Sequence, residues 1–169
     1  MSASAAYLGA ALTAIDPKGR LAIPATFRNP ILQSSGNDKR VYIGRNPHAP
    51  CLVGFGQSRF DELEAQLRMR ERAANERGEN FRTEHHGGSV FSSTFPLSFD
   101  ASGRLTLPPM LLRSVGITDK AFFSGNGLDF SIWDPQTLID HDDPLLKSQK
   151  FDASWLLEEF EGKIAGGGK

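Results

Sequence analysis

The chain has 169 residues, which is enough for one ordinary domain or two small ones and too few for a (β/α)₈ barrel. Hydrophobic residues make up 39% of the chain and charged residues 23%, a composition that predicts a folded core and excludes the disordered class. The net charge is −1, but residues 134–169 contain four lysines and eight acidic residues, so the remainder carries +3.

The sequence also bears on membranes, disulfides and metals. No apolar run reaches the roughly 18 residues that would cross a bilayer, and residues 1–14 lack the basic start and apolar stretch of a signal peptide. Cys51 is the single cysteine, so neither an internal disulfide nor a thiolate zinc cage is available. We therefore expect a cytoplasmic protein with no membrane partner, no metal and no cofactor.

The main feature of the sequence is an internal repeat. Residues 16–24 read DPKGRLAIP, and residues 100–108, which lie 84 positions later, read DASGRLTLP. Five of the nine positions are identical. Looser matches follow in the same order: Phe27 with Leu111, Val41–Ile43 with Ala121–Phe123, and Leu52–Phe55 with Phe130–Trp133. A duplication within the chain is the direct interpretation.

Each copy of the repeat predicts a hairpin turn. Asp16 and Gly19, like Asp100 and Gly103, occupy the first and fourth positions that a type I turn favours. Apolar and polar residues alternate on both sides of the second turn, as in half-buried strands. The strand before the first turn has a weaker pattern.

A short helix is expected after each hairpin. Ile23–Pro24 and Leu107–Pro108 mark strand-to-helix junctions, because proline extends the residue before it and suits the start of a helix. Gly36 and Gly116 are the expected ends of these helices.

Two more short apolar runs in each copy predict strands, and a helix follows them. Ser58 and Asp61 resemble a capping box, and Phe60, Leu63 and Leu67 form one apolar helical face. The charged stretch that comes next predicts a solvated helix end. A tail containing Trp155 and Phe160 is expected to dock as one or two amphipathic turns before the terminal glycines fray.

These elements predict an α+β fold that is mainly β. A single copy would be marginal alone, so the two copies are expected to bury each other, with their hairpins interleaved in a pseudo-twofold, barrel-like core with peripheral helices. The expected organisation has repeats at residues 7–75 and 92–143, a linker at 76–91, and an amphipathic segment with a flexible tail at 144–169.

The repeated motif resembles that of the MraZ family. Asp-x-Lys-Gly-Arg-Leu-x-Ile-Pro-x-x-Phe-Arg at residues 16–28 is echoed as Asp-x-x-Gly-Arg-Leu-x-Leu-Pro at 100–108, and the likeness covers roughly residues 7–140. The resemblance implies two AbrB-like swapped-hairpin (SpoVT-AbrB) repeats. It also implies a bacterial regulator of the division and cell-wall gene cluster that forms rings and binds short direct repeats upstream of its own operon, in the cytoplasm at the nucleoid.

The arginine after each turn glycine is the leading candidate for DNA contact. Arg20 and Arg104 extend from hairpin edges, where a guanidinium can bind a phosphate or a guanine. Lys18 at the turn tip adds charge for phosphate, whereas its counterpart Ser102 offers only a hydroxyl. Further basic candidates are Arg28, with Arg113 as its nearest equivalent, and Lys39 with Arg40. The competing interpretation pairs each arginine with the aspartate of its own turn, which would brace the hairpin.

A monomer with three or four phosphate contacts would bind DNA weakly and in a salt-sensitive way. A ring-like homo-oligomer that contacts tandem operator repeats would bind more tightly through effective concentration. The expected activity is therefore that of a transcriptional regulator, a repressor, that acts on double-stranded DNA and has no catalytic residues or small-molecule substrate.

Three other functions stay open on the sequence. An AbrB-type antitoxin would use the acidic C-terminal segment to inhibit a toxin, and a purely structural oligomer would need no DNA. A small hydrolase would use Cys51 with His48 as its base, although no orienting acid stands near them. His85 and His86 lack a third metal ligand at useful spacing.

Overall fold

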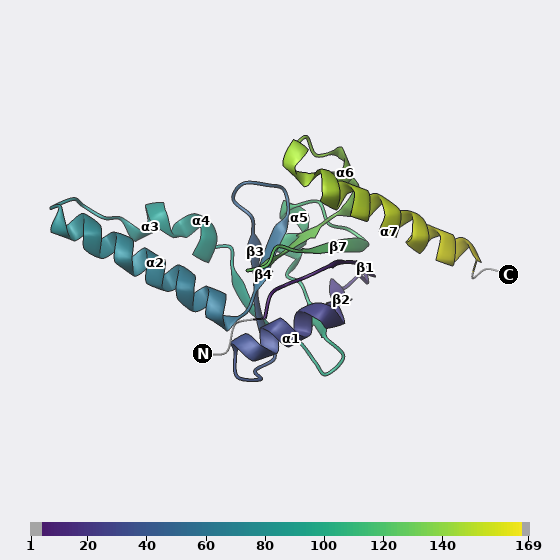
Figure 1. Ribbon diagram of the computed structural model, residues 1–169, viewed down its shortest axis with the longest axis horizontal. Coiled ribbons are helices and arrows are strands. Elements are labelled where there is room, and N and C mark those ends of the chain that lie inside the picture. Colours follow the sequence, from purple (N-terminus) through teal and green to yellow (C-terminus); the bar gives the residue numbers. More distant parts are fainter. Residues whose placement is uncertain (1–4, 167–169) are drawn as a thin grey trace.

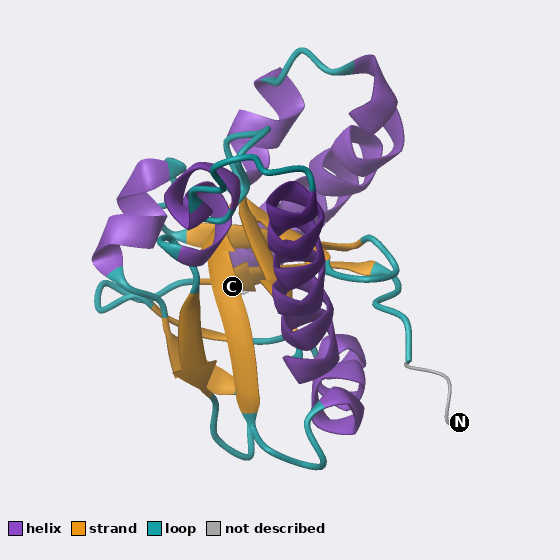
Figure 2. Ribbon diagram, turned by 90° about the vertical axis from the view of Figure 1, so that its left-hand side faces the viewer, coloured by secondary structure: helices purple, strands orange, loops and turns teal. Residues whose placement is uncertain are grey.

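The computed structural model describes residues 5–166, in which short strands alternate with helices (Figure 1). In chain order the elements are β1 (Ala10–Ala14), β2 (Arg20–Ala22), α1 (Ala25–Ser34), β3 (Arg40–Arg45), β4 (Leu52–Phe55), α2 (Gln57–Glu76), α3 (Thr83–His86), α4 (Gly88–Phe91), β5 (Phe95–Ser98), β6 (Arg104–Thr106), α5 (Pro109–Ser114), β7 (Lys120–Gly125), β8 (Phe130–Trp133), α6 (Pro135–Asp140), a 3₁₀ turn (Pro144–Leu146) and α7 (Lys147–Gly166). The strands lie at the centre and the helices surround them (Figure 2). The fold is α+β, as expected.

The strands form two antiparallel sheets. The larger has six strands in the order β1-β7-β8-β4-β3-β5, and the smaller is a ribbon of β2 and β6. Exchanging β1, β3 and β4 with β5, β7 and β8 leaves the six-stranded order unchanged when it is read backwards. The ribbon and the pairs β1–β7, β3–β5 and β4–β8 all join the first half of the chain to the second.

The expected barrel is wrong, because the larger sheet does not close. β1 and β5 each pair with a single neighbour, so they are the two edges of the sheet. The physical reason is that β2 and β6 leave their own hairpins and pair with each other. They form a separate two-stranded sheet and do not connect β1 with β5, the two edge strands of the larger sheet.

One apolar core holds the two halves together. Phe27 of α1 is fully buried and stacks on Phe130 of β8, with ring centroids 5.0 Å apart. Leu21 and Leu105, which face each other in the ribbon, are buried in the same cluster. Because the core takes side chains from both halves, its hydrophobic stabilisation depends on their association.

Both expected strand-to-helix junctions are confirmed. Helix α1 begins after Pro24 and α5 after Pro108. Gly36 and Gly116 follow the ends of these helices with positive φ angles of 65° and 72°. In each case the N–H two residues beyond the C-cap donates to a carbonyl of the last turn, which is the geometry that favours glycine.

The expected capping box at Ser58 is wrong. Helix α2 begins at Gln57 with Gly56 as its N-cap, so Ser58 already lies inside the helix. The Ser58 hydroxyl donates instead to the carbonyl of Ser34 at 3.2 Å. The apolar face is present: Phe60 stacks on Tyr42, with ring centroids 4.4 Å apart.

Two long helices, α2 and α7, extend at opposite ends of the molecule. Helix α2, together with α3 and α4, forms an arm at one end of the molecule, and α7 extends at the opposite end (Figure 1). Helix α7 has 20 residues, more than the one or two turns expected. The expected frayed end lies partly in residues 167–169, outside the described residues. Within residues 5–166, no helix is long and apolar enough to span a membrane.

Candidate nucleic-acid interface

The first hairpin turn is built around the carboxylate of Asp16. Its Oδ1 accepts hydrogen bonds from the backbone N–H groups of Lys18 (3.0 Å) and Arg20 (2.8 Å). Gly19 has a φ of 80°, and its N–H donates to the carbonyl of Asp16 at 2.9 Å. This turn matches the one that the sequence predicts.

The second turn repeats this backbone arrangement. Asp100 Oδ1 accepts from the N–H groups of Ser102 (2.9 Å) and Arg104 (3.0 Å). Gly103 also has a φ of 80°. The pKa of Asp100 lies below its ordinary value, chiefly because the Arg104 N–H donates to the carboxylate; the nearby charges of Arg104 and Lys39 add to this effect.

Each turn is joined to the strand of the other half. Leu107 N donates to the carbonyl of Gly19 at 2.9 Å, and Ile23 N donates to that of Gly103 at 2.8 Å. The two turns are therefore fixed relative to each other, so the arginine that follows each turn has a defined place in the same ribbon.

The ribbon presents both arginines on one face. Its register pairs Arg20 with Thr106, Leu21 with Leu105, and Ala22 with Arg104. Since side chains alternate along a strand, the buried leucines place Arg20 and Arg104 together on the opposite, exposed face. The arginines are diagonal neighbours, a relationship that separates residues by about 7–8 Å.

An open groove runs beside this exposed face. Its volume is about 620 Å³, and it is lined by Asp16, Arg20, Asp100, Arg104, neighbouring ribbon residues and the end of β1. The groove thus brings together the motif residues of both repeats.

The two arginines differ in their partners. Arg20 Nε donates to Asp16 Oδ2 at 2.6 Å, while 58% of the Arg20 side chain remains exposed. Among the described residues, Arg104 forms no ion pair, and it is exposed. The bracing interpretation therefore holds in part for Arg20 and is wrong for Arg104.

Similar proteins carry a common name. Transcriptional regulator MraZ of Ruegeria pomeroyi is 35% identical over 129 residues, which cover 73% of this chain and 74% of the relative. The protein of the same name from Rickettsia bellii is 32% identical over 75% and 79% of the two chains, and that from Gluconacetobacter diazotrophicus is 30% identical over 76% and 78%. The chain belongs to the MraZ family of transcriptional regulators. No protein-family model matches it.

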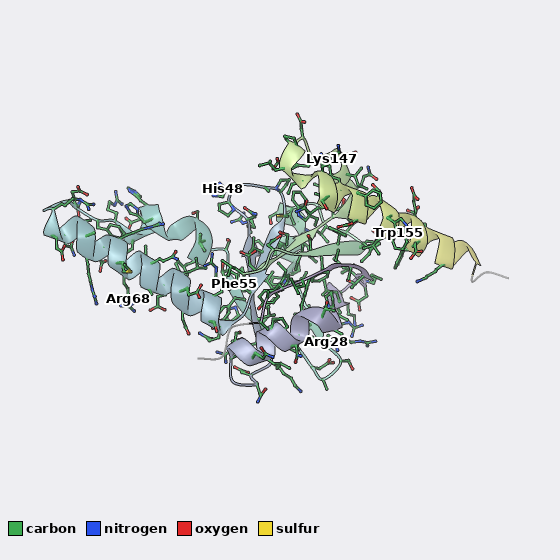
Figure 3. All side chains as sticks on the ribbon, viewed as in Figure 1. Arg28, His48, Phe55, Arg68, Lys147 and Trp155 are labelled. Carbon is green, nitrogen blue, oxygen red and sulfur yellow. The ribbon has the colours of Figure 1, made fainter. Side chains whose placement is uncertain are left out.

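Two other predicted basic residues of this MraZ-family chain lie apart from the groove. Arg28 on α1 is half-buried, and its Nε donates to the carbonyl of Ile23 at 2.9 Å (Figure 3). Its guanidinium lies directly over Gly103, where any Cβ would collide with it. By the 84-residue spacing, the residue equivalent to Arg28 is Leu112 rather than Arg113, and Leu112 covers Gly19 as Arg28 covers Gly103. Arg113 is exposed on α5.

The remaining basic candidates flank the turns. Lys18 is exposed at the first turn. The backbone of Lys39 joins the second turn, because its carbonyl accepts from Phe99 N at 3.0 Å. Arg40 lies 3.6 Å from Asp38 in an exposed pair. The equivalent of Lys39 beside the first turn is Asp119, whose carbonyl accepts from Ile15 N at 2.8 Å.

Ala22 and Thr106, which were not predicted from the sequence, lie on the same face of the ribbon, opposite Arg104 and Arg20 respectively. In the sequence, both residues alternate with a leucine, Leu21 or Leu105, and this pattern places them on the face opposite the leucines. The pattern shows that the two residues share a face with the arginines only once β2 is known to pair with β6.

Cys51, the nucleophile in the hydrolase interpretation, is a buried thiol. Cys51 is 1% exposed, and burial raises the pKa of its thiol to about 12. A buried thiol with this pKa is protonated at neutral pH and acts as a small apolar filler.

His86, one of the two histidines considered as metal ligands, stacks on the ring of Phe81 with centroids 4.2 Å apart.

Proposed function

We propose that this regulator binds double-stranded DNA through the exposed face of the β2–β6 ribbon. The observation that carries the proposal is the placement of Arg20 and Arg104 on that one face. A guanidinium can donate two hydrogen bonds to O6 and N7 of guanine or bind a phosphate. A two-stranded ribbon is narrow enough to enter the major groove.

The surrounding charges support this orientation. Lys18 at the first turn and Lys39 at the second are exposed lysines on either side of the ribbon. In the proposal they bind phosphates and set the position of the ribbon on the duplex. Exposed Arg113 on α5 also binds phosphate in the proposal, whereas Arg28 packs against Gly103 of the second turn.

The chain acts in this proposal as a ring-like homo-oligomer on tandem repeats. One ribbon offers few phosphate contacts, so tight binding needs several subunits on successive DNA repeats. Exposed Phe151 and Trp155 on α7 support self-association, because large apolar side chains exposed on adjacent turns mark interaction surfaces.

The biological target belongs to the same proposal. It is the division and cell-wall gene cluster, including the chain's own operon, where occupancy of promoter repeats represses transcription. The protein would act in the cytoplasm, at the nucleoid, and without catalysis.

The domain organisation is also part of the proposal. The two halves are AbrB-like swapped-hairpin repeats at residues 7–75 and 92–143, joined by a linker at 76–91 and followed by the C-terminal segment at 144–169. The symmetric strand order and the cross-half ribbon support this division.

The direct test is the double variant R20A/R104A on DNA from upstream of the chain's own coding sequence. We expect the variant to lose binding in an electrophoretic mobility shift assay, while its circular dichroism and oligomeric state stay unchanged. R68A is the matched control, since Arg68 is an exposed arginine of the α2 arm paired with Glu64. A double variant that shifts the fragments like the wild type would contradict the proposal.

A further inference from the structure

We infer that Asp16 is a positioning residue that holds Arg20 ready to read a base, whereas Arg104 binds mainly phosphate. The two repeats would then divide the work of recognition: the first supplies sequence specificity and the second supplies affinity. This inference rests on the proposed function and concerns how the same face discriminates between DNA sequences.

The two turns provide an internal comparison. In both, one carboxylate oxygen accepts the backbone N–H groups two and four residues later, at distances of 2.8–3.0 Å. The difference is the second oxygen. Asp16 Oδ2 also accepts from Arg20 Nε at 2.6 Å, while the structure shows no such bond from Arg104 to Asp100. Capping of the turn is therefore common to both aspartates, and orientation of an arginine belongs to Asp16.

The neighbouring charges favour the same asymmetry. The Lys39 backbone joins the second turn, and the charge of Lys39 helps to lower the pKa of Asp100. At the first turn the corresponding backbone position is Asp119, whose side chain pairs with Lys120 at 3.3 Å. Within residues 5–166, an acidic residue thus takes the place of Lys39 beside the first turn, and Asp16 Oδ2 binds Arg20.

A guanidinium held through Nε keeps the outer edge formed by its two Nη groups. That edge presents parallel N–H donors, which match the two acceptors of guanine in the major groove. Because the side chain is already ordered, binding costs less rotamer entropy. The carboxylate behind it also repels phosphate, so the pair favours a base edge over the DNA backbone.

Arg104 has the opposite properties. Its guanidinium is exposed and unpaired within residues 5–166, and Lys39 stands near the same turn. An exposed cation without an ion-pair partner, beside a second cation, suits the high negative charge of the phosphates, where geometry matters less than charge.

The test compares D16N with D100N and R20K with R104K. An asparagine retains the oxygen that accepts the backbone N–H groups but removes the negative charge and the acceptor for Nε. A lysine retains the charge but loses the planar fork. The probes are a duplex enriched by the wild type from a random-sequence pool and a scrambled duplex of the same composition. The measured quantity is the dissociation constant for the scrambled duplex divided by that for the enriched duplex, so a high ratio means high sequence specificity.

We expect D16N and R20K to lower this ratio about tenfold, in line with the cost of ordering one side chain and losing a bidentate contact. D100N and R104K should leave it within about twofold. In salt titrations, R104A should reduce the slope by about 0.9 for each engaged subunit, the value for one lost phosphate contact. D16N should retain its affinity for the scrambled duplex, because the change removes a negative charge from the interface.

The outcomes separate the inference from the proposed function. If the pool yields no enriched sequence, sequence-specific binding itself is wrong. If the wild type discriminates but D16N and D100N give equal ratios, the aspartates only cap their turns and the inference fails. If R104K lowers the ratio as much as R20K does, both arginines read bases and the division of labour is wrong. Should D16N unfold, D16E replaces it, since glutamate keeps the charge but shifts the carboxylate away from Arg20 Nε, and R20K against R104K tests the different roles of the two arginines.

Discussion

The glycines of the two turns are held in place by close neighbours from the opposite half. A Cβ on Gly19 would lie 2.9 Å from the carbonyl oxygen of Leu107, and the φ of 80° is one that side-chain-bearing residues rarely adopt. At Gly103 the obstacle is the guanidinium of Arg28, which is the end of a flexible side chain. The first turn is therefore the less tolerant of the two.

We expect G19A to lower the free energy of unfolding by about 1–3 kcal/mol through its positive φ, with a further loss from the backbone contact. G78A is the control, because Gly78 has a φ of 70° but open space around it. Urea unfolding should show a larger loss for G19A than for G78A. Equal losses would mean that the contact with Leu107 contributes nothing.

The turn carboxylates also make stability depend on pH. The pKa of Asp16 lies below its ordinary value, chiefly because the Arg20 N–H donates to it, with the Arg20 side chain and the Lys18 N–H adding. A pKa that is lower in the folded than in the unfolded protein stabilises the fold above the unfolded value, and this contribution disappears as the pH falls through the folded value.

The wild type should therefore lose stability on acidification below about pH 4, the ordinary range of aspartate. The doubly substituted D16N/D100N protein should show a flatter decline over the same interval. Thermal unfolding at a series of pH values measures both curves. Parallel curves would show that these two carboxylates contribute nothing to the acid dependence.

At the scale of the elements, patterns of neighbouring residues predicted the turns and helix ends correctly, whereas the arrangement of the strands into an open sheet was not predicted. The turns at Asp16 and Asp100 and the helix ends at Gly36 and Gly116 follow from neighbouring residues, so the sequence predicts them. Interleaved hairpins were expected, but an open sheet was not, because the sequence does not show that β2 and β6 form a separate two-stranded sheet. The start of α2 was misplaced because Gly56 caps it without a side chain.

The candidate site shows the same limit. Its residues could be named because the motif repeats, but the motif is identical where the two turns differ: both have aspartate, glycine and arginine at equivalent positions. The pairing of Arg20 with Asp16 could be suggested from the motif, but the motif does not show that only the first turn forms this pair or that Arg28 packs over Gly103. Sequence spacing alone does not place such neighbours.

At the scale of the whole molecule, α7 leaves apolar surface exposed. Phe151 is 69% and Trp155 is 51% exposed, and with Ala10, Asp152 and Leu156 they line a hollow of about 300 Å³. The α2 arm at the other end carries a smaller hollow lined by Leu63, Leu67 and Arg70. In the proposed ring, contact between unlike ends of successive copies would join the subunits head to tail, and such contacts form a ring when the rotation between copies closes.

W155S should therefore weaken self-association, with a dissociation constant raised about tenfold or more, the usual effect of removing a buried aromatic side chain from an interface. Light scattering coupled to size-exclusion chromatography over a dilution series measures this change. L145S is the control, since Leu145 is 86% exposed and lies outside the hollow. Identical profiles for W155S and the wild type would exclude this helix as a contact.

The pairing of β2 with β6 has a consequence for synthesis of the protein. Arg20 and Thr106 are partners in the ribbon, yet 85 residues separate them along the chain. While the polypeptide is still emerging from the ribosome, its first half has nothing to pair with and its arginine has no companion. The proposed DNA-binding face can therefore form only after β6 has been synthesised, and we expect a translation product that ends before β6 not to compete with the full-length protein for DNA.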